Sequence, residues 1–181
     1  PLEFVDHVGT PLRDGLVFAH NCLKGAGLRE SIRIGASARI ITAFDMVRAL
    51  ALGADWCNAA RGFMFALGCI QSMACHTDRC PTGVATQDKS RARALVVDDK
   101  ATRVAQFHAH TLEALAELIA AAGVAHPSAI TRERIMKRLS AAEVKSFADL
   151  YPELEAGELL RGGDSDYAKW WARAEAGRWG L

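Results

Sequence analysis

Three cysteines lie close together in the middle of the chain, at Cys69, Cys75 and Cys80, and the last is followed directly by Pro81. Thiolates on short irregular segments hold iron–sulfur clusters, and a Cys-Pro pair closes the ligand run of bacterial ferredoxins. Zinc would need a fourth ligand, and His76 adjoins Cys75 instead of following it at the usual spacing. Three soft ligands without a fourth therefore indicate a 3Fe-4S cluster. The alternative is three small buried side chains that bind nothing.

A second set of small residues could hold an anion. Small side chains let backbone N–H groups approach a phosphate, and a helix N-terminus favours negative charge. In a (β/α)8 barrel the loops after strands 7 and 8 commonly form such a site. Simple turns are the alternative interpretation, and Arg61 or Arg39 either adds charge toward the phosphate or lies on the surface. The candidate residues are Gly35, Ser37, Ala59, Ala60, Arg61 and Gly62.

The first half of the chain alternates between helical and extended patterns. We predict helices that begin at Thr10-Pro11, at the capping box Thr42–Asp45 and at about Gly62, with buried strands over 31–35 and 55–59 between them. This alternation is typical of parallel α/β structure. Two strands cannot form a self-sufficient parallel sheet. Either the chain supplies the end of a larger sheet, or it borrows strands from another copy.

In the second half of the chain the sequence pattern predicts only helices. They run over about residues 100–122, from Ser128 onward, and from the apparent capping box Ser140–Glu143 to near Pro152. We therefore expect residues 1–97 to form the α/β part and residues 98–181 a helical C-terminal extension, so that helix predominates by residue count.

Aromatic residues are concentrated in the tail, where we expect Trp170, Trp171 and Trp179 to pin it onto the body or onto a partner subunit. His20, which follows Arg13 and Asp14 on the first predicted helix, is expected on the helix surface.

Composition limits the kinds of partner. The 181 residues carry 22 Lys and Arg against 21 Asp and Glu, so the net charge of +1 gives no reason to expect nucleic acid or an anionic membrane. The most apolar stretch, residues 104–124, contains two histidines and two glutamates, which excludes it as a membrane span. No secretory signal is visible, and five cysteines do not form a disulfide framework in a chain of this size, so we expect a reducing cytoplasm.

The residues from Ala66 to Gln87 resemble the cluster-binding segment of the central domain of glutamate synthases, which has Cys-His-Thr-Asn-x-Cys-Pro-x-Gly-Val-Ala-Thr-Gln at this place. The run Ala49–Asp55 is similar to the link into the last strand of flavin-binding barrels. The resemblance extends over about residues 1–125 and fits best the FMN-binding glutamate synthase family. It implies that the chain is the C-terminal portion, about strands 7 and 8, of a (β/α)8 barrel, with a cluster-binding segment at 69–87 and a helical tail.

The resemblance also implies roles for particular residues. Cys69, Cys75 and Cys80 stand where the family ligates its 3Fe-4S cluster, and the candidate anion residues named above stand where it holds the FMN phosphate. Three departures are visible: Gly35-Ala36-Ser37 replaces an Asp-Gly-Gly type sequence, Ala60 replaces a common glycine, and Arg61 stands where a small hydroxyl residue is common. The earlier strands, most of the flavin-ring surface and the 2-oxoglutarate site are expected upstream of Pro1. Catalytic residues therefore stay unassigned.

The function implied by the resemblance is that of an oxidoreductase of nitrogen metabolism. The parent protein would form glutamate from 2-oxoglutarate and ammonia, free or derived from glutamine, by way of 2-iminoglutarate. An electron-donor protein or subunit would supply electrons, which the cluster would relay to FMN. Alternatives are an N-methylglutamate synthase-type subunit, or a catalytically incomplete chain that acts only as a structural or interaction module. We expect this chain alone to be inactive without the missing barrel half or another copy.

Overall fold

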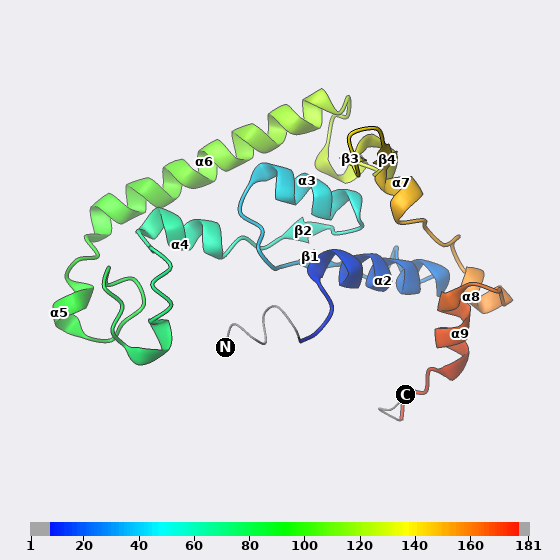
Figure 1. Cartoon of the computed structure of the whole chain (residues 1–181), viewed down its shortest axis with the longest axis horizontal. Coiled ribbons are helices and arrows are strands. Elements are labelled where there is room, and N and C mark those ends of the chain that lie inside the picture. Colours follow the sequence, from blue (N-terminus) through cyan, green and yellow to red (C-terminus); the bar gives the residue numbers. More distant parts are fainter. Residues whose placement is uncertain (1–7, 178–181) are drawn as a thin grey trace. The chain divides into compact units, whose positions relative to one another are not determined.

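The computed structural model describes residues 8–177, which form two compact units (Figure 1). The first unit contains the chain up to Ala36, Ala49–Trp56 and everything from Thr131 onward; the second contains Ser37–Arg48 and Cys57–Ile130. These units do not follow the predicted division at residues 97 and 98, because the segment after Thr131 packs on the helix Leu12–Gly25. That division concerned the end of a parent barrel and stays a prediction.

Helix α2 (Leu12–Gly25) begins after Pro11, close to the predicted start, and buries Leu16, Val17 and Asn21. Its last residue is glycine for a packing reason. A Cβ at Gly25 would lie 2.6 Å from Cγ of Leu159 and 2.9 Å from Cδ1 of Leu154. Gly25 therefore lets two leucines of the C-terminal segment reach the helix backbone.

Strands β1 (Gly35–Ala36) and β2 (Trp56–Cys57) form a two-stranded sheet. The predicted buried strand over 31–35 is wrong, because residues 31–34 are not in a strand and Ile32 is exposed. Side chains bind the backbone there: Arg29 donates to the Ile32 carbonyl, and the Ile34 amide donates to Asp55. Part of the backbone hydrogen bonding of this segment is therefore satisfied without a neighbouring strand. Residues 8–177 contain no closed barrel, and the (β/α)8 architecture of the parent stays a prediction.

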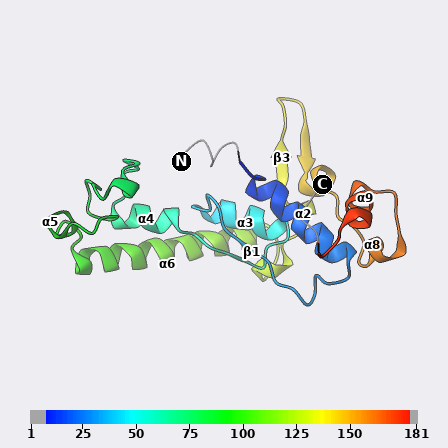
Figure 2. The same ribbon diagram turned by 90° about the horizontal axis from the view of Figure 1, so that it is seen from below.

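The predicted helices after Ser128 and from Ser140 are wrong, since a β-hairpin occupies this part of the chain (Figure 2). Residues 140–143 form its turn, where the Leu139 amide donates to the Glu143 carbonyl at 2.9 Å. The true capping box is Ser146–Asp149. From Thr131 onward the elements are η3 (Arg132–Arg134), β3 (Met136–Arg138), β4 (Val144–Ser146), α7 (Phe147–Leu150), α8 (Glu158–Arg161) and α9 (Asp166–Arg173).

Asn21 anchors the C-terminal segment to α2 and is only 1% exposed. Its Nδ2 donates to the Pro152 carbonyl at 3.0 Å and to the Tyr167 hydroxyl at 3.1 Å, while its Oδ1 accepts from the Leu154 amide at 3.4 Å. The Tyr167 ring also stacks on Phe18, with 5.8 Å between ring centres. A tyrosine therefore fixes the tail where the sequence predicted tryptophans.

The described tail tryptophans do not pin the tail onto the body, whereas the alternative, contact with a partner subunit, stays a prediction. Trp170 and Trp171 are exposed, and Arg173 lies over the Trp170 ring. Trp179 lies outside the described residues.

The second unit is helical. Its predicted capping box is confirmed: the Thr42 amide donates to Asp45 at 3.0 Å, and the Asp45 amide donates to the Thr42 hydroxyl at 3.2 Å. No helix within residues 8–177 is long and apolar enough to cross a membrane. The elements are α3 (Ala43–Ala51), which begins in this unit, α4 (Arg61–Leu67), η1 (Cys75–Thr77), α5 (Lys89–Ala92), α6 (Val97–Ala121) and η2 (Pro127–Ala129).

Helix α4 packs against α6 through aromatic rings. Phe63 and Phe107 meet edge to face with 5.2 Å between ring centres, and Phe107 also contacts Gly62, where a Cβ would lie 2.7 Å from Cζ of the ring. This packing holds the N-terminal part of α4, the helix that the cysteine segment follows in the chain.

Replacing Asn21 with alanine should destabilise the chain by about 1–3 kcal/mol, because buried groups of the C-terminal segment lose their hydrogen bonds. Tyr167→Phe removes only one hydroxyl and should cost less, about 0.5–1.5 kcal/mol. Denaturant unfolding measures both, with Glu30→Ala on the surface as control. An Asn21→Ala variant as stable as the control would contradict this anchoring role.

Candidate functional site

The three predicted ligands lie in the second unit, on the segment between α4 and α5. Cys69 follows Gly68, whose φ of +106° ends α4, and its amide donates to the Met64 carbonyl at 2.9 Å. Cys75 is exposed and begins η1, whereas Cys80 is buried at 5% exposure. All five cysteines of the chain are free thiols.

Cys80 differs from the other cysteines because donors surround its sulfur. The Thr82 hydroxyl lies 3.5 Å from Sγ, and backbone amides of Ala85, Thr82 and Val84 also donate to it. These hydrogen bonds, with that of Thr82 the largest, lower the pKa of Cys80 to about 7. The loop therefore stabilises the thiolate, which is the form that binds metal.

Cys22 and Cys57 show the opposite behaviour. Burial raises the pKa of both thiols, so each favours the neutral form. Both side chains are half-buried, which is compatible with a packing role.

Gly83 gives the loop after Cys80 its shape. Its φ is +76°, and a Cβ there would lie 2.4 Å from the carbonyl oxygen of Arg91, a distance that backbone atoms cannot accommodate. Only glycine therefore fits where this loop approaches α5.

The described residues offer no preformed site for a single metal ion. Within residues 8–177 no three histidine, cysteine, aspartate or glutamate side chains converge closely enough to hold one metal ion. In a cluster each thiolate binds a different iron atom, so the sulfurs need not meet at one point. The cluster ligands Cys69, Cys75 and Cys80 stay a prediction, supported by the thiolate environment of Cys80.

The predicted phosphate residues fall in both units. Gly35 belongs to the first unit, where a Cβ would lie 2.6 Å from the Trp56 ring. Ser37 begins the second unit, in which Ala59 and Ala60 lead into α4 and Gly62 contacts Phe107. Both glycines thus already have a packing role. Arg61 is exposed and the first amides of α4 have no partner within the helix, which is compatible with an anion. The phosphate site stays a prediction.

The first unit contains a cluster of charged side chains that the sequence did not predict. Glu153 lies 3.5 Å from Nε2 of His20 and 3.0 Å from Nε of Arg132, and it also pairs with Lys24. The proximity of His20, and then the hydrogen bond from Lys24, lower the pKa of Glu153 to about 2. At these contact distances neither Nε2 of His20 nor Nε of Arg132 has the geometry of a hydrogen bond, so both pairs are electrostatic contacts. Arg132 is 2% exposed and also donates to the Leu52 carbonyl at 3.2 Å.

His20 is not on the helix surface as predicted, since its side chain is 12% exposed. Arg29 Nε donates to His20 Nδ1 at 3.2 Å, so Nδ1 is the acceptor and Nε2 carries the proton that faces Glu153. Arg29 also donates to Asp55 at 2.9 Å, and Asp55 accepts from the Ile34 amide at 2.6 Å. The charges therefore connect the C-terminal segment to the residue before β1.

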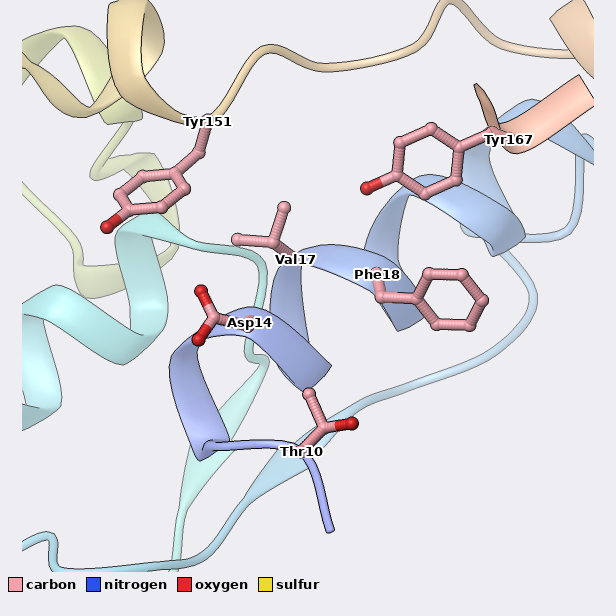
Figure 3. A pocket seen from close by; sticks show the side chains of 6 residues that line it. All are labelled: Thr10, Asp14, Val17, Phe18, Tyr151 and Tyr167. Atoms are coloured by element: carbon pink, nitrogen blue, oxygen red, sulfur yellow. The ribbon is translucent and has the colours of Figure 1, made fainter. Parts of the chain in front are cut away.

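A groove of about 450 Å³ crosses α2 in the same unit (Figure 3). Arg13 already contacts two of the side chains that line the groove. It lies 3.7 Å from the Asp14 carboxylate and 5.5 Å from the centre of the Tyr151 ring. The side chains that line the groove are Thr10, Asp14, Val17, Phe18, Tyr151 and Tyr167.

Comparison with known proteins places this chain in a class of enzymes. A family model that describes a conserved region in glutamate synthase matches residues 1–125. The chain belongs to the glutamate synthase family.

Three relatives show the extent of the similarity. The chain is 42% identical over 136 residues to the glutamate synthase large subunit-like protein YerD of Bacillus subtilis, which covers 75% of this chain and 26% of that protein. It is 36% identical over 124 residues to the archaeal glutamate synthase [NADPH] of Methanocaldococcus jannaschii, covering 68% and 24%. It is 32% identical over 123 residues to the B. subtilis glutamate synthase [NADPH] large chain, covering 68% and 8%. The aligned residues thus span about a quarter of these relatives' length or less.

Replacing Glu153 with glutamine should destabilise the chain at pH 7, because buried Arg132 loses its charged partner. A carboxyl whose pKa is depressed on folding stabilises the native state above its unfolded pKa, and that contribution is lost as the pH falls through the folded value. Wild-type stability should therefore fall between about pH 4.5 and about pH 2, and Glu153→Gln should show a smaller fall. Thermal unfolding across this range measures the difference. Glu143→Gln is the surface control; equal pH dependence in all three chains would refute the role of Glu153.

Replacing Thr82 with valine should raise the pKa of Cys80, because the largest stabilising donor is lost. Alkylation with iodoacetamide at a series of pH values, followed by peptide mass spectrometry, reports the thiolate fraction at each cysteine. We expect the half-maximal pH for Cys80 to move upward from about 7. The Cys22 and Cys57 peptides of the same samples serve as internal controls, and an unchanged Cys80 profile would exclude the Thr82 contribution.

Proposed function

We propose that this chain is the C-terminal part of the FMN-binding barrel of a glutamate synthase-like oxidoreductase, in which Cys69, Cys75 and Cys80 hold a 3Fe-4S cluster. The parent protein forms glutamate from 2-oxoglutarate and ammonia, by way of 2-iminoglutarate. Family membership supports the activity. The observation that carries the cluster is the set of donors around Cys80, which a cysteine used only for packing does not need.

The cluster, when bound, supplies one-electron transfer. The residues of this chain prepare the ligands for it. The amides of Ala85, Thr82 and Val84 and the Thr82 hydroxyl lower the cost of releasing the Cys80 proton, which must leave before iron binds. Cys75 is exposed and Cys69 is half-buried, so iron can reach both sulfurs.

FMN, when bound, supplies hydride transfer. Gly35, Ser37 and the run Ala59–Gly62 are proposed to hold its phosphate end. The first amides of α4 lack helical partners, and Arg61 beside them is exposed and positively charged. The flavin-ring surface and the 2-oxoglutarate site are assigned to the part of the parent that precedes this chain.

The electron donor is proposed to be a separate protein or subunit. The relatives include glutamate synthases named for NADPH and one from Arabidopsis thaliana named for ferredoxin. Both names describe those proteins, and this chain is proposed to use a donor of one of these two kinds.

The cluster is tested by anaerobic reconstitution of the purified chain with iron and sulfide. We expect about three iron atoms per chain and an EPR signal of an oxidised 3Fe-4S centre. Cys75→Ser should abolish the signal, since an exposed serine preserves the fold but is a poor ligand. Cys57→Ser is the matched control and should retain it. An iron-free wild-type chain, or equal loss in both variants, would overturn the proposal.

A further inference from the structure

The loop from Asp78 to Gln87 contains Cys80, the Thr82 hydroxyl that lies 3.5 Å from its sulfur, and the backbone amides of Thr82, Val84 and Ala85 that stabilise its thiolate. The loop lies between η1 and α5 and contains no helix or strand of its own. Other contacts must therefore hold the amides of Thr82, Val84 and Ala85 toward Cys80. The observed geometry shows which contacts do so.

Asp78 ties the two ends of the loop together. It follows η1 in a left-handed conformation, with φ of 60° and ψ of 13°, and so reverses the chain. Its Oδ1 accepts hydrogen bonds from the Gln87 amide at 2.5 Å and from the Thr86 hydroxyl, which lies 2.9 Å away. The same hydroxyl lies 2.7 Å from the Asp78 carbonyl oxygen.

The Thr86 hydroxyl is oriented by a further contact. It accepts from the Asp88 amide at 3.1 Å, so its own hydrogen is directed to Asp78. Asp88 in turn accepts from the Ser90 amide at 2.8 Å and begins α5. The closing contact at Asp78 is thereby connected to the helix on which Gly83 packs.

We propose that Asp78 is a positioning residue of the metal site: its side-chain oxygen closes the loop that presents backbone amides to Cys80, and cluster assembly depends on this oxygen as a hydrogen-bond acceptor and not on its charge. The statement about cluster assembly rests on the proposed function, in which the three cysteines hold a cluster. The closure of the loop rests only on the contacts around Asp78. The Asp78 side chain is exposed, so its replacement creates no cavity in the core and tests the loop itself.

Two substitutions at this position separate acceptor from charge. Asp78→Asn keeps an oxygen that can accept from Thr86 and Gln87, and asparagine tolerates the left-handed conformation. Asp78→Ala removes the acceptor. Asp99→Ala is the matched control, since Asp99 is an exposed aspartate of the same unit that pairs only with neighbouring Lys100 in the contacts observed.

Hydrogen exchange of the metal-free chain tests loop closure directly. We expect the amides of Thr82, Val84 and Ala85 to exchange at least about tenfold faster in Asp78→Ala, and at wild-type rates in Asp78→Asn and Asp99→Ala. Thr86→Val, which removes the hydroxyl from the other side of the contact, should accelerate the same amides. Wild-type exchange in both Asp78→Ala and Thr86→Val would overturn the inference.

Reconstitution at limiting iron tests the consequence for the cluster. Asp78→Ala should bind several-fold less iron than wild type, Asp78→Asn should restore binding, and Asp99→Ala should not change it. Equal iron content in Asp78→Ala and wild type, or equal loss in Asp78→Asn and Asp78→Ala, would overturn the inference. A wild-type chain that takes up no iron would instead refute the proposed cluster, and the exchange experiment would still decide the role of Asp78.

Discussion

A thiolate in a buried position is costly unless hydrogen-bond donors surround it, and the loop after Cys80 meets this requirement with its own backbone. The requirement explains the local sequence: Gly83 is needed where the loop approaches the Arg91 carbonyl, and Asp78 where the chain reverses. Because the donors are mostly amides, the Cys80 environment depends on the path of the backbone more than on neighbouring side chains. The functional proposal depends on this one environment.

The first unit depends on a different interaction, between residues more than a hundred positions apart. Asn21 binds the backbone of Pro152 and Leu154, and Glu153 between them contacts His20, Lys24 and Arg132. A buried arginine without a carboxylate would be strongly destabilising, so the contact of Glu153 with Arg132 stabilises the packing of this segment on α2. Through Arg29 and Asp55 they continue to the backbone of Ile34, directly before β1.

The matched family region and the C-terminal segment are therefore joined by specific contacts. Residues 1–125 match the glutamate synthase model and contain the cysteines and both strands of the first sheet, whereas the segment after Thr131 lies beyond that match. Asn21 and His20, on the matched side, receive this segment through buried polar contacts. The segment thus stabilises the helix that leads toward β1, a role distinct from the cluster chemistry.

The sequence by itself determined what depends on local spacing: the cysteine constellation, the capping box at Thr42 and Asp45, the long helix α6 and the family. Tertiary structure alone decided the hairpin at 136–146, the burial of His20 and the closure of the Cys80 loop at Asp78. Helical periodicity and ligand spacing are properties of neighbouring residues, whereas these three features depend on a strand partner, on charges over a hundred residues away and on a reversal of the backbone. Ser140 matched a capping box as well as Ser146 did, and only strand pairing placed the turn.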